Sequence, residues 1–455
     1  MKNRRRIEGT AFLFVFIFLS LFIHAQDAEV SRLATIQYGT ETEIASLIQA
    51  LRSESVDYLD GELVTLIENT RNQRILSGVF GFFGDREKSG LESRAIRAIT
   101  EREEESNETV ISAIDYLGRV KHAQAVSVIM DILDTEERRF MNVGFRALGR
   151  ASSSDKKAAD EAAEFLIDFY ENRNPGSDNQ RDVITAIGAT SSLKGVSFLS
   201  ELALNTDERV PLRTAALDAL SKIGDSGGLE AILACVGTND PNVRSAAVAA
   251  LGPFSGDAVD RAILDAFRDS YYRTRIAAAQ ASRDRKLAAA VPYLKYRAER
   301  DDVPNVRDEA IRALGAIAGE EALSVLDSLF SDRKNSDRVR LIAAEMLMKN
   351  SADRNLSRLI IELDDTRTKN QTALYNGFLK VIGETVVRGD KTDMENITRR
   401  FLRSGSLIEK LYGLDMAVNN SLVSLGEEIK TLAADRNESL SRKARRTAET
   451  LGIEI

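Results

Sequence analysis

The chain has 455 residues, of which 43% are hydrophobic, and its formal net charge at pH 7 is −8. This length is ample for a sizeable hydrophobic core. The acidic balance argues against non-specific binding to nucleic acid, because that binding depends on Lys and Arg side chains that meet phosphates. The single cysteine, Cys235, excludes an internal disulfide, and its apolar neighbours predict a buried thiol that acts as a small hydrophobe.

Residues 1–25 have the pattern of a secretory signal peptide. Basic residues stand at positions 2 and 4–6, and an apolar run interrupted only by Ser20 covers 11–23. That run is shorter than the roughly 20 residues that a membrane-spanning helix needs. We expect cleavage after Ala25 and export, and an uncleaved anchor is the alternative. Cleavage also removes four basic residues and Glu8, which leaves 62 − 4 = 58 basic and 70 − 1 = 69 acidic residues, a net charge of −11.

Residues 26–58 are expected to form an N-terminal helical cap, and residues 59–455 a repeat array whose template is the segment 224–256. Apolar residues at 229, 232, 233 and 236 follow the period of an amphipathic helix. Asp240 is placed to cap a second helix, and Pro241 suits its first position. Gly252 stands where a C-terminal glycine is expected. One unit is therefore a helix, a tight turn, a second helix and a loop.

An arginine marks the second helix of each central unit at a nearly constant interval: Arg213, Arg244, Arg275, Arg307 and Arg340. Alanine is frequent on the stripe that follows, and small side chains let neighbouring helices approach closely. The same register places twelve helix ends, at Gly84, Gly118, Gly149, Gly188, Ser221, Gly252, Arg283, Gly315, Met348, Gly383, Asn419 and Gly452. So regular a period, too long for a heptad, is typical of stacked repeats, and the predicted fold class is an all-α solenoid of about twelve helix pairs.

Two segments depart from the plain repeat. The interval from Gly149 to Gly188 is the longest between predicted helix ends, and it contains the polar stretch 171–178, which predicts an exposed loop open to proteolysis. The glycine-rich run 76–84 lacks the preceding strand and the Lys-Ser/Thr pair of a phosphate-binding loop. Gly78 and Gly81 are therefore interpreted as small residues that permit close helix packing.

The motif Asp240-Pro241-Asn242-Val243-Arg244, followed by Ala250-Leu251-Gly252, resembles HEAT repeats. It is similar to the short bacterial type also found in phycobilisome-lyase-like proteins, most clearly over 205–350. The segment 302–307 matches almost as well. The resemblance implies an α-solenoid used mainly for protein binding, without implying a particular partner. It also implies that the five repeated arginines tie neighbouring repeats together through acidic side chains, and a row of ligand-binding arginines is the alternative interpretation.

The residue types in the chain argue against catalysis and metal binding. His122 is the only histidine left after cleavage, and the register places it in a turn between helices. A single histidine offers neither a catalytic triad nor a metal cluster. We therefore expect no catalytic residues, no metal site, no cofactor and no enzymatic activity.

The second helices are expected to line the concave side of the solenoid. Positions one and five after each arginine would then face outward and vary in type, and the candidate protein-binding residues among them are Asp218, Gln280, Asp308, Arg312 and Glu345. The predicted function is an exported scaffold or adaptor that binds a protein or peptide partner along this face. The alternative is a structural cell-envelope protein that bridges wall or membrane components without a discrete site. Export and the lack of disulfides favour the periplasm or envelope of a bacterium, with no nucleic-acid partner and no membrane span after cleavage.

Overall fold

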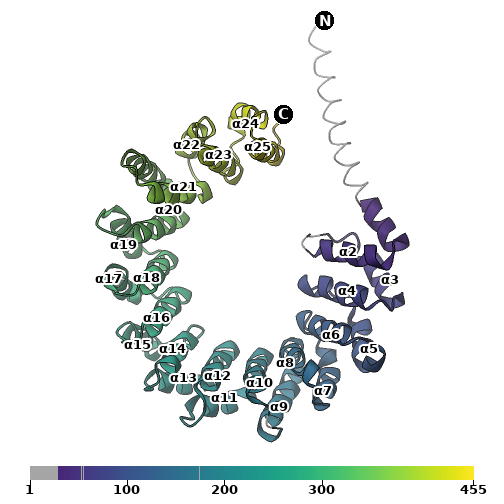
Figure 1. Cartoon of the computed structure of the whole chain (residues 1–455). Coiled ribbons are helices and arrows are strands. Elements are labelled where there is room, and N and C mark those ends of the chain that lie inside the picture. The colour runs from purple at the N-terminus through teal and green to yellow at the C-terminus, as the bar shows by residue number, and fades with distance from the viewer. Residues whose placement is uncertain (1–28, 53, 55, 174) are drawn as a thin grey trace. The chain divides into compact units, whose positions relative to one another are not determined.

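The computed structural model describes residues 29–52, 54, 56–173 and 175–455, and Figure 1 shows them as helices joined by short turns. The predicted signal peptide, 1–25, lies outside the described residues. The described chain contains α-helices and short 3-10 turns and no strand, as the repeat pattern predicts. It divides into two units, Met1–Ala234 and Cys235–Ile455.

In the first unit, residues 29–38 are helical and twelve labelled helices follow (Figure 1). They alternate between an outer row and an inner row, and each inner helix packs against the inner helix of the next repeat. The inner helices are α2 (Glu41–Leu51), α4 (Gln73–Asp85), α6 (Asn107–Arg119), α8 (Arg138–Ser152), α10 (Ser177–Thr190) and α12 (Val210–Ile223). The outer helices are α3 (Asp60–Asn69), α5 (Glu92–Thr100), α7 (Val126–Asp134), α9 (Lys156–Asn172) and α11 (Gly195–Leu204), and α13 (Leu229–Val236) contains the boundary between the units.

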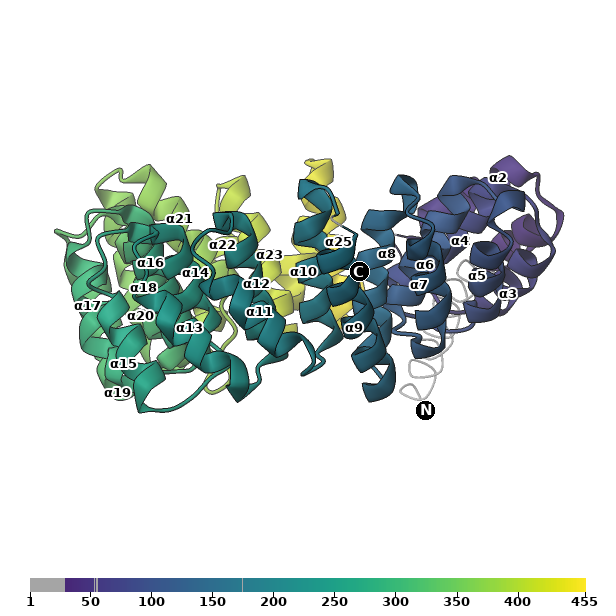
Figure 2. The ribbon, with the colours of Figure 1, turned by 90° about the horizontal axis from the view of Figure 1, so that it is seen from below.

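The second unit repeats the alternation, with the helices of each row standing side by side (Figure 2). Its inner helices are α14 (Pro241–Ala250), α16 (Tyr272–Asp284), α18 (Pro304–Ile317), the first half of α20 (Asp337–Thr368), α21 (Thr372–Glu384), α23 (Leu407–Asn419) and α25 (Glu438–Leu451). Its outer helices are α15 (Asp257–Ala266), α17 (Val291–Arg300), α19 (Glu320–Ser331), the second half of α20, α22 (Thr392–Leu402) and α24 (Gly426–Ala433).

Side-chain caps explain where several inner helices begin. The carboxylate of Asp240 accepts hydrogen bonds from the amides of Asn242 and Val243, at 2.9 and 3.0 Å, and Pro241 occupies the first turn. The predicted cap is therefore confirmed. Asn72 and Ser106 cap α4 and α6 in the same way, so local sequence fixes the start of these helices.

The predicted alanine stripe is buried between inner helices. Ala216, Ala247, Ala278 and Ala310 are fully buried, and bulky side chains such as Phe330 fill the space toward the outer row. All twelve predicted helix ends lie close to an observed end or, for Met348, to the kink in α20 at Ser351. The sequence register therefore follows the repeats from α4 to α25.

The glycines at these ends act differently from the expectation. Gly224 and Gly452 do cap helices with a positive φ of 68°, but Gly252 lies beyond the end of α14 without a positive φ. Gly118 and Gly188 lie inside their helices. A Cβ atom at Gly188 would come within 2.7 Å of the Cα of Ala219 on the next inner helix. Most of these glycines are therefore spacers for helix packing rather than left-handed caps.

The predicted loop at 171–178 is shorter than expected. Helix α9 extends to Asn172 and α10 begins at Ser177, so the additional residues of this repeat mostly lengthen α9 to 17 residues. Its first residues are capped by Asp155, and Phe169 near its end is buried. The additional residues of α9 therefore contribute to helix packing rather than to a loop.

Candidate binding grooves on the inner helices

Two of the five repeated arginines link consecutive repeats through aspartates, of which Asp301 is buried and Asp269 half-buried. Arg244 donates to both carboxylate oxygens of Asp269 at 2.8 and 3.1 Å, and Arg275 donates to both oxygens of Asp301 at 2.7 and 2.8 Å. The backbone carbonyl of each aspartate also accepts from the arginine of its own repeat, with Arg275 bound to Asp269 at 3.0 Å and Arg307 to Asp301 at 2.6 Å. One aspartate per loop thus joins two successive arginines.

Of the remaining three arginines, Arg340 is the one that pairs with an acidic side chain in the described structure. Arg340 binds Glu362 at 2.6 Å and lies 5.6 Å from the centre of the Phe378 ring, whereas Arg213 binds the carbonyl of Ala203 at 3.0 Å. Arg213, Arg275 and Arg340 are buried, which places their guanidinium groups between helices and away from a ligand.

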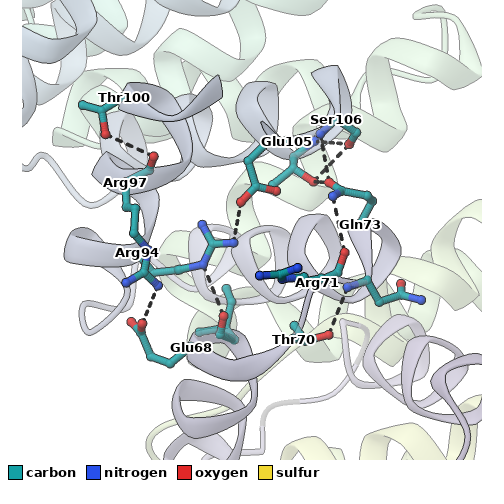
Figure 3. Close-up of polar contacts among 12 residues, drawn as sticks. Glu68, Thr70, Arg71, Gln73, Arg94, Arg97, Thr100, Glu105 and Ser106 are labelled. Carbon is teal, nitrogen blue, oxygen red and sulfur yellow. Dashed lines mark hydrogen bonds and ion pairs between the residues drawn. The ribbon is translucent and has the colours of Figure 1, made fainter. Parts of the chain in front are cut away.

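A further arginine of this kind lies in the first unit, outside the predicted series. Arg94 of α5 is buried and donates to the carbonyl of Ile67 at 3.3 Å and to Glu105 at 2.6 Å (Figure 3). Beside it, Gln73 accepts from the amide of Ser106 at 3.0 Å. Loops of adjacent repeats are therefore tied by polar contacts here as well.

Two opposing effects set the pKa values of Asp301 and Asp269. Burial raises the pKa of Asp301, but hydrogen bonds from Arg275 and from the Val303 amide outweigh it and hold the pKa below its usual range. The pKa of Asp269 is also lowered, because its bonds to Arg244 and to the Tyr271 amide outweigh burial. Both carboxylates are therefore charged at neutral pH.

A groove with a volume of about 1140 Å³ lies across the inner helices of the first unit. It is lined by α2, α4 and α6, together with Arg146 of α8. Gly78 and Gly81 have no side chains to cover α4 at these two positions, so the helix backbone there forms part of the groove floor. A Cβ atom at Gly78 would lie 3.2 Å from Ile48, which agrees with the predicted packing role.

A chain of alternating charges crosses one end of this groove. Arg52 binds Asp85 at 2.8 Å, Asp85 binds Arg119 at 2.9 Å, and Arg119 binds Asp115 at 2.6 Å. Arg146 then donates to Asp115 at 3.2 Å. These side chains are partly exposed, so the pairs connect consecutive inner helices while still facing solvent.

The five predicted binding residues all lie on inner helices, Asp218 in the first unit and the other four in the second. Asp218 and Arg312 are exposed, and Gln280 and Glu345 are half-buried. Asp308 is buried beneath Arg338, which donates to its Oδ2 at 2.7 Å. The expectation that Asp308 faces outward is therefore wrong, because an arginine of the next inner helix covers it.

The structure also places the two other residues that the sequence singled out. His122 lies in the turn between α6 and α7, and Cys235 in α13 is 2% exposed. Among the helices that the structure describes, none combines the length and the apolar character required to cross a bilayer.

The sequence interpretation missed the residues that build the groove and the aspartates that pair with the repeated arginines. A signal existed for both. Asp269 and Asp301 follow Arg244 and Arg275 at nearly equal distances along the chain. Asp85 lies about midway between Arg52 and Arg119. The Asp85 spacings of 33 and 34 residues are close to one repeat, and the Asp269 and Asp301 spacings are 25 and 26 residues, so a search for opposite charges at recurring separations would have found them.

Comparison with known proteins identifies the family. A family described as spirochaete HEAT repeat protein matches residues 36–447. No curated protein matches. Crystal structures of Kap121p, alone and bound to Pho4p, are similar over 92% of this chain at 13% identity, with TM-scores of 0.46 and 0.45, and the chain spans 53% of that protein. The E. coli protein YibA is similar over 66% of this chain and 95% of its own, at 15% identity and a TM-score of 0.34. Because the family match covers most of the sequence, the chain belongs to the spirochaete HEAT repeat protein family.

Proposed function

We propose that this protein is an exported scaffold that binds a protein or peptide partner along its inner helices. The observation that carries the proposal is the open groove of about 1140 Å³ over α2, α4 and α6. The half-buried Ile111 and the backbone at Gly78 and Gly81 line its floor, and polar and charged side chains of both signs surround them. Protein interfaces commonly combine apolar contact area with polar and charged side chains.

Export is the second part of the proposal and is supported by the basic and apolar pattern of residues 1–25. Fractionation of the native bacterium and mass spectrometry of the N-terminus test it. A mature chain that begins at Gln26 in the envelope fraction supports export. A cytosolic chain that keeps Met1 contradicts it.

Blocking the groove tests the binding role. Ser77 of α4 and Ser112 of α6 line the groove and are half-buried, so S77W/S112W should fill it. Ser127 of α7 and Ser197 of α11 are exposed on outer helices, which makes S127W/S197W a matched control. Both variants must melt like the native protein before binding is compared.

The assay is cross-linking and affinity capture from envelope extract. We expect one stoichiometric protein with the native chain and with S127W/S197W, and its loss with S77W/S112W. Equal capture by all three proteins would show that the groove is not the binding site. Sedimentation with peptidoglycan in place of a captured protein would instead support the wall-bridging alternative.

A further inference from the structure

The last inner helix carries an exposed row of cations in a protein whose net charge is −8. Four basic residues fall within five positions of α25, at 442, 443, 445 and 446. Arg442, Lys443 and Arg446 line a groove of about 710 Å³ between α25 and α23. This groove belongs to the second unit, whereas the groove over α2, α4 and α6 belongs to the first.

Two of these cations are unpaired within the described chain. Lys443 binds Asp415 of α23 at 2.7 Å, and Arg445 donates to the carbonyl of Ala433 at 3.3 Å. The guanidinium groups of Arg442 and Arg446 have no such bond in the part of the chain that the structure describes, and both side chains are exposed. Arg442 and Arg446 repel each other as like charges four residues apart on a helix, and Glu438, which lines the same groove four residues before Arg442, forms no ion pair with it in the described structure.

The opposite wall of the groove, on α23, is formed by Asp415, which Lys443 binds, and by the apolar Val418. Leu411 and Ile408 lie four and seven positions before Asp415, which places them on the same face of the helix. Ile408 is 50% exposed although it is large and apolar. An occupant would thus meet guanidinium groups on one side of the groove, Val418 on the other and, beyond the groove itself, the exposed Ile408.

We propose that this groove, formed by α23 and α25, binds an acidic segment of a partner protein that also carries apolar residues. Carboxylates would pair with Arg442 and Arg446, while aliphatic side chains would cover Ile408 and Val418. A groove between two helices suits a narrow segment better than a flat bilayer surface. Two unpaired guanidinium groups are few for the extended phosphate backbone of a nucleic acid, whose binding rests on many such contacts.

The test uses the full mature chain and a fluorescein-labelled peptide composed of Asp, Glu and Leu. A peptide with Lys in place of every acidic residue is the ligand control. The variant R442E/R446E removes the proposed contacts without breaking any bond in the described structure. The variant R261E/R300E makes the same charge change at exposed positions of the outer helices α15 and α17 and serves as its match. Circular dichroism and thermal melting verify that both variants fold.

Fluorescence anisotropy should show binding of the acidic peptide that weakens as salt increases, and little binding of the Lys peptide. R442E/R446E should lose about tenfold or more in affinity, because two charge-assisted contacts disappear, while R261E/R300E should bind like the native chain. Equal affinity of the two variants would overturn the proposal. Binding to phosphatidylglycerol vesicles without binding to the acidic peptide would overturn it as well, since the cations would then serve a membrane surface.

Discussion

Removing the carboxylate of Asp301 should destabilise the second unit more than any comparable change at its surface. The Asp301 side chain is fully buried and accepts from Arg275 at 2.7 and 2.8 Å, from Arg297 at 3.3 Å and from the amide of Val303 at 3.0 Å. D301A leaves the buried Arg275 guanidinium with two backbone carbonyls and the exposed Asp302. Breaking a buried ion pair costs about 3–5 kcal/mol, and these remaining acceptors place the expected loss near the lower limit.

Urea unfolding combined with hydrogen exchange of the amides in α16 and α18 measures this loss, because repeat proteins open locally. D265A is the control, since the Asp265–Arg268 pair lies in the same unit but is 73% and 67% exposed. Its effect should be small. R275M/D301L, which replaces both charges with apolar side chains, should recover much of the stability. Equal destabilisation by D301A and D265A would refute the structural role of the pair.

Three further predictions concern pH, helix packing and the inner face. The free energy of unfolding should fall as the pH drops below about 3.9, the unfolded pKa of an aspartate, because the unfolded chain then takes up a proton at Asp301 that the folded chain, with its lowered pKa, does not. D301A should flatten this part of the pH profile, and an unchanged profile would contradict the prediction. G188A should lose about 1–3 kcal/mol of unfolding free energy in urea, because its Cβ atom would meet the next helix. G61A has open space around it and should be neutral or stabilising, and the opposite order of stabilities would contradict the packing role of Gly188. R312E and E345K should weaken capture of an envelope partner without changing the melting temperature, and normal capture would exclude this part of the inner face.

The architecture was predictable because each repeat follows the same local rules. Asp240 and Pro241 predict a helix start, and the arginine interval gives the period directly. The role of Gly188 was harder to predict. A glycine near a helix end fits both a left-handed cap and a packing spacer, and the distance to the next inner helix decides between them.

Exposure on the inner helices could be predicted only in part. The register correctly places Asp308 on the second helix of its repeat, but it does not show that Arg338, from the following repeat, lies over it. The groove over α4 could not be predicted for the same reason, because it forms where the neighbouring helices α2 and α6 leave the surface of α4 uncovered. Such features depend on pairs of side chains a repeat apart, which a pattern within one repeat does not contain.

Helix α20 joins two repeats without an intervening turn, and its departure from helical geometry is at Ser351, with φ of −154° and ψ of 51°. Other connections between an inner helix and the next outer helix pass through a turn, as at Lys121 and Ser421. A residue inserted into such a turn can bulge into solvent. A residue inserted into the helical residues that directly follow Ser351 would rotate the rest of that helix by about 100° and aim Leu356 and Leu359 away from the core. Length variation among relatives should therefore accumulate in the turns and spare this junction.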